Sequence, residues 1–419
     1  MILPVNKLKK ISWYRQGAAG KPLYVSYPLQ ACDHFYLKDR PIDLHYEYIV
    51  MDLYKNNLKD WLWIDNLKDV ADYYLQKEYK QKDYIKHLYK WWKIKHFYSL
   101  SKELKLFNSK KLAKYSNNQL IQQFVDISEK YLLAWRNCIF QDAYDYWGDK
   151  ILLELILKSG NKIDNQSLQK LFTPSTQTIY SKQQLDFNKI VNLVKNNKKI
   201  KLIVQKENLQ QLKLHWPKIY LLILKHSTKY SWMHNDYATV TYLNDKYFFL
   251  ELKKKINEKN KFKYKKIKLP TINNDIAIVV NFLNIISAWR DDRKALGQIA
   301  LFTINNLIKE ISLRTKININ FFEHMFWFEI PKVFKMTKVQ KKEINLRIKK
   351  GILYYVDNMN RHQLFYGNER KKLLNLLNKA TIKHKLELTG MPVSGGVITG
   401  KVKIIMDKND FSKLKKMKF

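Results

Sequence analysis

The sequence predicts a mainly α-helical protein with many helices, a small mixed segment at its N-terminus and a β-hairpin at its C-terminus. Apolar residues recur every three or four positions in two long stretches, 120–138 and 278–299, which is the spacing of one helix face and indicates the helical class. Because 46% of the residues are hydrophobic, the chain can bury a sizeable core, and global disorder is excluded.

The chain divides into a mixed segment, 1–66, and a helical domain, 67–385. Within the mixed segment we expect extended stretches at Leu23 to Tyr27 and His45 to Val50, because glycine and proline punctuate the chain around them. Helical spacing begins near Leu67. One apolar stripe predicts a long helix: Leu120, Phe124, Ile127, Tyr131, Trp135 and Cys138. A nearby aromatic cluster is expected to belong to the core: Tyr89, Trp91 and Trp92.

A second long helix is predicted beyond Pro270, with this stripe: Ile278, Phe282, Ile285, Trp289, Leu296 and Ile299. The same register places Asp292 on the apolar face. A buried carboxylate needs a partner, so we expect Arg290, Arg293 or a residue of another helix to pair with it. The alternative is a polar site in a cleft between helices, in which Arg290 and Arg293 bind an anion.

The charge balance is strongly basic, with 77 Lys and Arg against 37 Asp and Glu, a net +40. Only nine of the basic residues are arginines, which leaves 68 lysines. Glycine, proline and arginine have GC-rich codons, so an AT-rich genome explains part of the lysine excess. Arginine would then remain where its planar side chain has to make two parallel hydrogen bonds to a carboxylate or phosphate. We expect this of Arg361 and of the three candidate substrate-binding residues, Arg290, Arg293 and Arg347.

A lysine-rich connection occupies residues 252–269, with nine lysines and one glutamate between Lys253 and Lys268. Phe262 and Tyr264 alternate with lysines there, a pattern that suits stacking on bases beside a phosphate backbone. A solvated connection between two apolar elements has the same composition. A basic helical protein that binds nucleic acid or another polyanion is therefore an alternative function.

Several other classes of site are not supported. Cys32 and Cys138 are too far apart for a CxxC motif, and one pair cannot build a disulfide scaffold, so a reducing cytoplasm is expected. No signal-peptide run or membrane-length apolar segment occurs, and no membrane partner is expected. His324 lacks HExxH spacing, so no metal ligand is assigned. The segment His234 to Asp236 is expected to begin a turn or cap a helix.

The C-terminal segment 386–405 reads LELTGMPVSGGVITGKVKII. Its small residues permit a tight turn and a close backbone approach before a second strand: Ser394, Gly395, Gly396 and Gly400. The stretch also satisfies GxxxxGK, but Val402 stands where a phosphate-binding loop needs a hydroxyl, and an alternating strand follows where a helix should begin. A β-hairpin is the structure that these residues predict.

Together with the later Asp407, Asp410 and Phe411, this hairpin resembles the opening of the swivelling phosphohistidine domain of phosphoenolpyruvate-utilising enzymes, such as phosphoenolpyruvate synthase. Val393 departs from the small residue of that pattern. Weaker similarity extends upstream over roughly the last 200 residues. The resemblance implies that 386–419 begins an α/β mobile domain, and that the complete protein uses Mg²⁺ with ATP or phosphoenolpyruvate.

The phosphate-carrying histidine of that family is absent, because His384 precedes the hairpin and lacks the flanking glycines and serine. No catalytic residue is therefore assigned, and we expect a truncated or split reading frame that is inactive alone. The leading hypothesis is the N-terminal portion of a phosphoenolpyruvate synthase-like phosphotransferase. Its partner would be the missing phosphohistidine part or a separate nucleotide-binding protein. A third hypothesis is a scaffolding subunit that pairs with a separate phosphohistidine protein.

Overall fold

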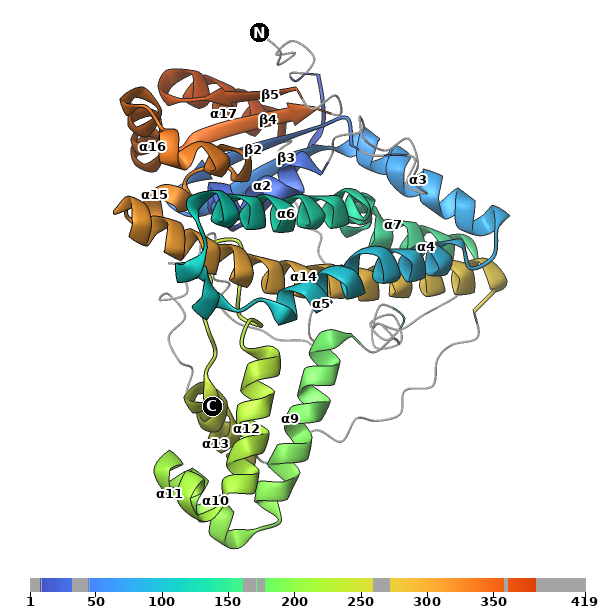
Figure 1. Cartoon of the computed structure of the whole chain (residues 1–419). Helices are drawn as coiled ribbons and strands as arrows, with labels where there is room; N and C mark the ends of the chain where they lie inside the picture. The colour runs from blue at the N-terminus through green and yellow to red at the C-terminus, as the bar shows by residue number, and fades with distance from the viewer. Residues whose placement is uncertain are drawn as a thin grey trace, which may run out of the picture.

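The computed structural model describes residues 8, 10–31, 44, 46–160, 171, 178–258, 272–357 and 361–381. The fold of this part is mainly helical and includes one five-stranded antiparallel sheet, which confirms the predicted fold class (Figure 1). The predicted hairpin within 386–405, with Ser394, Gly395, Gly396 and Gly400, lies outside the described residues. So does the lysine-rich stretch from residue 259 onward.

The sheet joins the two ends of the described chain. Its order is β1-β3-β2-β4-β5, and every neighbouring pair is antiparallel. The strands are β1 (Trp13–Ala19), β2 (Tyr48–Tyr54), β3 (Asn57–Trp63), β4 (Ile352–Asp357) and β5 (His362–Phe365). Lys55 and Asn56 both have positive φ, 50° and 62°, which matches the tight hairpin between β2 and β3. Segments about 300 residues apart therefore share one sheet, through the β2–β4 pairing.

Two local predictions need correction. Residues 23–27 were expected to be extended, but they lie in the helix α2 (Pro22–Gln30), which Pro22 begins. Strands β4 and β5 fall within 67–385, which was predicted to be helical. Nearly all of α2 and all six residues of β4 are buried, so neither shows the alternation of exposed and buried positions from which its period could be read. The expected strand at 45–50 does exist in part, because β2 begins at Tyr48.

The long helices follow the predicted stripes. Helix α14 (Asn274–Thr315) runs through the middle of the molecule, and α6 (Asn117–Arg136) lies beside it. A capping box between Ser116 and Gln119 begins α6. The predicted core aromatic Trp92 is fully buried.

The other helices of this body are α3 (Ile64–Lys80), α4 (Tyr84–Trp92), η1 (Lys93–Tyr98), α5 (Ser99–Leu106), η2 (Ser109–Lys114), η3 (Ile139–Asp142), α7 (Ala143–Lys158), α15 (Ile319–Glu323), η4 (Trp327–Lys335), α16 (Lys338–Lys350) and α17 (Gly367–Thr381).

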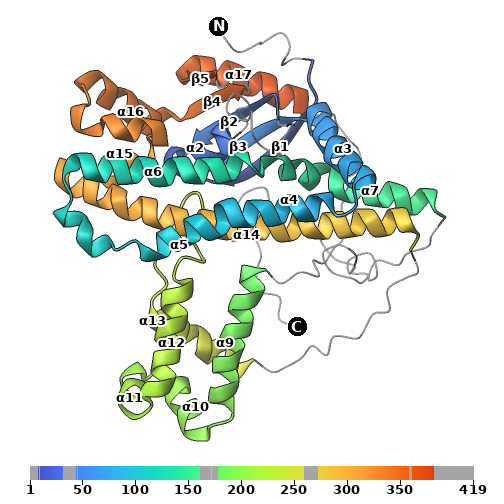
Figure 2. The same cartoon turned by 45° about the vertical axis from the view of Figure 1, so that its right-hand side comes forward.

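A group of five helices projects from the body on the side away from the sheet, as both views show (Figures 1 and 2). We call it the helical lobe. It consists of α9 (Ile179–Lys195), α10 (Lys198–Gln205), α11 (Leu209–His215), α12 (Pro217–Tyr230) and α13 (Asp245–Asn257). The lobe contacts the body where α9 meets α14.

The sheet separates two apolar layers. Ile49, Met51 and Leu62 belong to the large core under the sheet, to which α2, α6 and α14 contribute. Alternate positions, such as Val50 and Trp61, face a smaller core against α17. The two-residue alternation of β2 and β3 therefore places their apolar side chains on both faces.

A buried ion pair ties α17 to this sheet. The Arg370 guanidinium donates to both carboxylate oxygens of Asp52, at 2.6 and 2.9 Å. The two side chains are only 11% and 9% exposed. Burial raises the pKa of Asp52 above its usual value, and Arg370 acts against this shift. The arginine is therefore needed to keep a charged carboxylate at this position.

We expect Arg370→Met to destabilise the protein by about 3 to 5 kcal/mol, because it leaves the Asp52 carboxylate buried and unpaired. Chemical denaturation of the purified chain measures this loss. Lys371→Met changes the exposed neighbour in the same helix and serves as the control. Equal effects of the two substitutions would show that the ion pair is unimportant.

Candidate active-site cavity

A cavity of about 360 Å³ lies between the inner face of the sheet and α14. Its apolar walls come from α2 and the sheet, and include Val25, Ile49 and Leu58. Its polar residues come from several elements and converge on the same space: Gln16, Asp60, Asp142, Asp145, Arg290, Arg293, Lys294 and Gln298. A largely apolar cavity with a few convergent polar groups is the usual form of a small-molecule site.

Asp60 is the most unusual of these residues. It lies on the same face of β3 as Leu58 and Leu62, which belong to the core, and Gln16 and Met51 are its cross-strand neighbours. No ion pair joins Asp60 to a cation within the described part of the chain. Burial, with a further contribution from Asp142, raises the pKa of Asp60 to about 7. The carboxyl group therefore changes its charge near neutral pH.

Helix α14 supplies the cations of the cavity. Its lining residues recur every three or four positions, so they share one face of the helix: Arg290, Arg293, Lys294, Gly297, Gln298 and Leu301. Arg293 donates to the Asp142 carboxylate at 2.6 Å, and Arg290 pairs with Asp145. Asp142 ends η3 and Asp145 lies in the first turn of α7. These two ion pairs hold α14 against the junction of η3 and α7.

Arg293 retains unused hydrogen-bond donors. Its residue is 5% exposed, and its guanidinium stacks 4.2 Å from the centre of the Trp135 ring. Burial acts to lower the pKa of Arg293, but Asp142, Cys138 and Tyr237 together raise it, and the net shift is upward. The group is therefore always charged. Its Nε and Nη1 atoms have no acceptor among the described residues. A buried cation with free donors beside a cavity favours an anionic or oxygen-rich ligand.

One wall of the cavity is fixed by Gln298. Its side chain accepts a hydrogen bond from Tyr180 at 2.8 Å and donates to the carbonyl oxygens of Met233 and Asn235, at 2.9 and 2.8 Å. Asp236 accepts from the backbone N–H groups of Ala238 and Thr239, at 2.8 and 2.6 Å. This confirms the turn that was predicted there. The base of the helical lobe is thereby attached to α14 at the edge of the cavity.

The structure brings two of the three sequence-predicted candidates together. Arg290 and Arg293 both line the cavity, whereas Arg347 does not. Arg347 is a bidentate partner of Glu329, at 2.6 and 2.7 Å, and also donates to Glu343 at 3.1 Å. Its side chain is 1% exposed, which indicates a structural ion pair. Arg361 pairs with Asp357 at 2.7 Å and is 55% exposed.

The pairing of Asp292 differs in part from the prediction. Asp292 is buried as expected, but neither Arg290 nor Arg293 pairs with it, because both turn toward the cavity. Its partners come from α4 and η1: Tyr89 donates at 2.5 Å, and Lys93 lies at 2.8 Å. The expectation that another helix could supply the partner is confirmed. The Tyr89 ring also stacks on Trp289, at a centroid distance of 5.3 Å.

The sequence prediction did not include the acidic residues of the cavity. Asp142 and Asp145 lie near Arg290 and Arg293 only because η3 and α7 pack on α14. No local sequence pattern predicts that contact. Asp60 did leave a signal, since a lone carboxylate interrupts the apolar positions Leu58 and Leu62 of one strand face. That signal depends on first recognising β3 as a strand.

The lysine-rich connection begins in α13, where its lysines are neutralised. Lys253 pairs with Glu207, Lys254 with Glu251 and Lys255 with Glu258, at 2.6, 2.6 and 2.9 Å. These pairs are exposed, so they contribute little stability. They do reduce the positive charge that this helix presents to a polyanion.

The described residues contain no group of three or more His, Cys, Asp or Glu side chains that could hold a metal ion. In the same part of the chain, no helix has the length and apolar character required to cross a membrane.

Comparison with known proteins gives no further identification. No family model, curated protein or solved structure matches the chain. The likeness of residues 386–405 to the mobile domain of phosphoenolpyruvate-utilising enzymes therefore stays a prediction from the sequence.

The raised pKa of Asp60 predicts a pH-dependent difference between the natural chain and Asp60→Asn. The carboxyl group ionises near pH 4 when unfolded and near pH 7 when folded, so its ionisation costs stability progressively as the pH rises between these values. At pH 8 we expect Asp60→Asn to be more stable than the natural chain by about 2 to 4 kcal/mol. The difference should shrink toward pH 4.5.

Thermal or chemical unfolding at a series of pH values measures this difference. Asp69→Asn, which removes one carboxylate at an exposed position on α3, is the matched control. A constant difference for Asp60→Asn would show that this carboxyl has an ordinary pKa.

Substitution by lysine tests the argument that arginine was retained for its geometry. Arg347→Lys loses the bidentate contact with Glu329 and the contact with Glu343, so we expect a loss of about 1 to 3 kcal/mol. Arg361→Lys keeps a positive charge beside Asp357 and changes a side chain that is 55% exposed, so it should change stability by about 0.5 kcal/mol or less. Urea denaturation compares the two variants, and similar small effects would contradict the argument.

Proposed function

We propose that this chain is the helical portion of a phosphoenolpyruvate synthase-like phosphotransferase and that its cavity binds the molecule that accepts the phosphoryl group. The observation that carries this proposal is the placement of Asp60 and three cations of α14, Arg290, Arg293 and Lys294, on one cavity. Phosphoryl transfer to a hydroxyl needs a base for the leaving proton and cations for the phosphoryl oxygens. The resemblance of residues 386–405 supports the same class of reaction.

In the proposed reaction, an acceptor hydroxyl attacks the phosphorus of a phosphohistidine that another part of the protein, or a separate protein, supplies. The O–P bond forms as the N–P bond breaks, and the histidine nitrogen recovers the bonding electron pair. The hydroxyl proton passes to the Asp60 carboxylate. A base with a pKa near 7 is partly ionised at neutral pH and takes up a proton more readily than an ordinary aspartate.

The cations of α14 act on the phosphoryl group. Arg293 offers its unused Nε and Nη1 donors, and Lys294 has no carboxylate partner among the described residues. Arg290 and Arg293 are held in place by Asp145 and Asp142, so they need little rearrangement when the phosphoryl group arrives. The apolar walls suit a small organic acceptor.

Mg²⁺ and the phosphoryl donor enter this proposal through the sequence resemblance alone. Asp142 and Asp145 are already engaged by arginines, and the described residues contain no other cluster that could hold a metal. We therefore assign the metal and nucleotide to the phosphohistidine part or to a separate protein.

Phenyl phosphate, a simple phosphate monoester, tests the acceptor cavity without any other domain. We expect it to raise the thermal midpoint of the purified chain and to bind Arg293→Met at least about tenfold more weakly, because a buried charge-assisted contact is lost. Lys371→Met on α17 is the control for a lost positive charge. Equal binding to the natural chain, Arg293→Met and Lys371→Met would contradict the proposal that the cavity binds the acceptor. So would the absence of binding to the natural chain.

The reaction itself requires the phosphohistidine partner. The first step is to read the source DNA beyond codon 419 and to express with this chain any segment that encodes a glycine-rich Ser-His motif. Labelled ATP or phosphoenolpyruvate should then give an acid-labile, base-stable phosphate on histidine. Unrelated downstream sequence and no labelled partner would overturn the phosphotransferase proposal and leave a binding or scaffolding protein.

In a labelled system, Asp60→Asn should still form phosphohistidine but should lose about 100-fold or more of the transfer rate to an acceptor. The separate time courses of labelling and of label loss measure the two steps. A variant that transfers at the natural rate would exclude Asp60 as the base.

A further inference from the structure

A second hollow, which we call the interlobe groove, lies where the body meets the helical lobe. Its volume is about 380 Å³, and it shares no lining residue with the cavity. We propose that the interlobe groove binds an amphiphilic organic anion, whose apolar body lies on the aromatic lining and whose head group lies at two lysines of α5. This site does not depend on the proposed phosphotransferase function.

One wall of the groove is an irregular helix. Helices α4, η1 and α5 follow one another without a break, and η1 (Lys93–Tyr98) is a π-helix. Such segments are rare and occur frequently at functional sites. Phe97 and Tyr98, at the end of η1, line the groove and are 8% and 56% exposed. The π-helix also carries Lys93, the partner of Asp292. This segment therefore contributes both to that ion pair and to the wall of the groove.

The opposite wall presents only apolar parts of its aromatic rings. Tyr230 and Trp232 come from the end of α12 and the residues after it. The Trp232 indole N–H donates to the carbonyl oxygen of Lys229 at 3.0 Å, and the Tyr230 hydroxyl donates to Asp186 at 2.9 Å. Ile299 of α14 also lines the groove. Since the polar atoms of these rings are already bonded, the interior favours an alkyl or aryl group.

The charge at the rim is positive and partly uncompensated. Lys102 and Lys105 are exposed and lie on the same side of the helix as Tyr98, four and seven positions later. Neither has a carboxylate partner among the described residues. Lys229, the third lysine of the groove, pairs with Asp186 at 2.8 Å. Two free ammonium groups beside an apolar interior favour a ligand with an apolar body and one anionic head.

The same features disfavour other occupants. A nucleic acid strand needs a continuous basic track with several accessible rings, and only Tyr98 among the aromatic groove residues is more than half exposed. The segment 382–419 of this chain carries nine lysines against three acidic residues, so the lysines at the rim would repel it. A small amphiphilic anion meets both the charge and the apolar lining.

Decanoate is a suitable probe, and isothermal titration calorimetry of the full chain measures its binding. We expect saturable binding with one site, which the variant Lys102→Gln/Lys105→Gln weakens about tenfold because two ion pairs with the head group are lost. Tyr98→Ala should also weaken it. Lys102→Arg/Lys105→Arg should retain it, since the charge is kept. Decyl phosphate, measured in parallel, shows whether the site prefers a carboxylate or a phosphate head.

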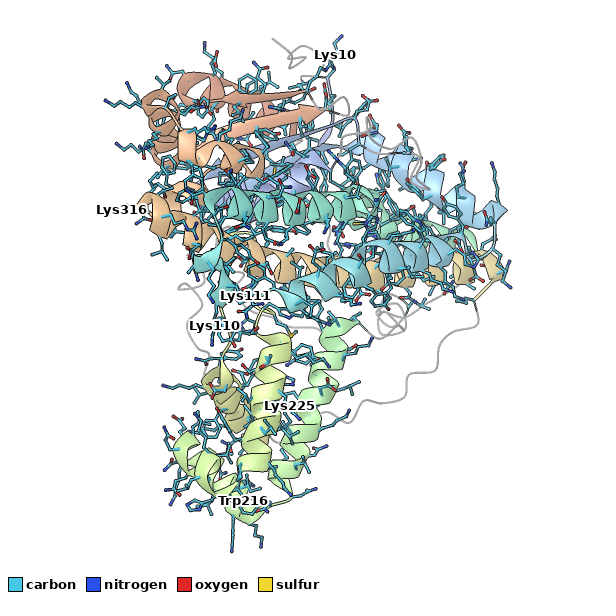
Figure 3. The ribbon with its side chains drawn as sticks, in the orientation of Figure 1. Lys10, Lys110, Lys111, Trp216, Lys225 and Lys316 are labelled. Carbon is cyan, nitrogen blue, oxygen red and sulfur yellow. The ribbon has the colours of Figure 1, made fainter. Side chains whose placement is uncertain are left out.

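The matched control is Lys110→Gln/Lys111→Gln, which removes two exposed charges from the neighbouring η2 (Figure 3). These residues do not line the groove, so decanoate should bind this variant as it binds the natural chain. Equal weakening in both double variants would indicate diffuse attraction to a basic surface and would overturn the proposal. So would the absence of saturable binding. Binding that only Arg293→Met removes would place the probe in the cavity, and this would also overturn the proposal.

Discussion

The ion pair between Arg293 and Asp142 sets the arrangement on which the cavity depends. The Arg293 side chain is only 6% exposed, so its charge is tolerated because Asp142, which is 21% exposed, pairs with it and Trp135 covers the guanidinium. With the Arg290–Asp145 pair beside it, this ion pair fixes the rotation of α14. One face of that helix then lies on the cavity, while Asp292 on a different face meets Tyr89 and Lys93. A rotation of α14 would disrupt all of these contacts together.

The parts of the fold that could be predicted from the sequence are those with one buried and one exposed face. Helix α6 and the first half of α14 show a clear apolar stripe, because their other faces contact water or polar groups. Helix α2 and strand β4 are buried on nearly all sides, so their sequences show no exposed face from which a period could be read. The pairing of β2 with β4 joins residues about 300 positions apart, and no local feature of either strand indicates its partner.

The rarity of arginine was informative about pairing but not about function. All four arginines singled out by that argument pair with a carboxylate: Arg290, Arg293, Arg347 and Arg361. Only the first two line the cavity. The distinction depends on what else surrounds the pair: Arg347 has Glu329, Glu343 and Tyr366 around it, whereas Arg293 keeps two donors without an acceptor. Satisfied donors indicate a structural role, and only the three-dimensional structure separates these two cases.

The charge of the cavity depends on the protonation of Asp60. Arg290, Arg293 and Lys294 contribute three positive charges, and Asp142, Asp145 and Asp236 contribute three negative ones. When Asp60 is protonated, this set is neutral. When Asp60 is ionised, the set has one excess negative charge and the carboxylate can accept a proton. Because burial places the pKa of Asp60 near 7, both states are populated at neutral pH. A group with an ordinary aspartate pKa would remain ionised, so the cavity would keep its base but would always carry an excess negative charge, which repels a phosphoryl group.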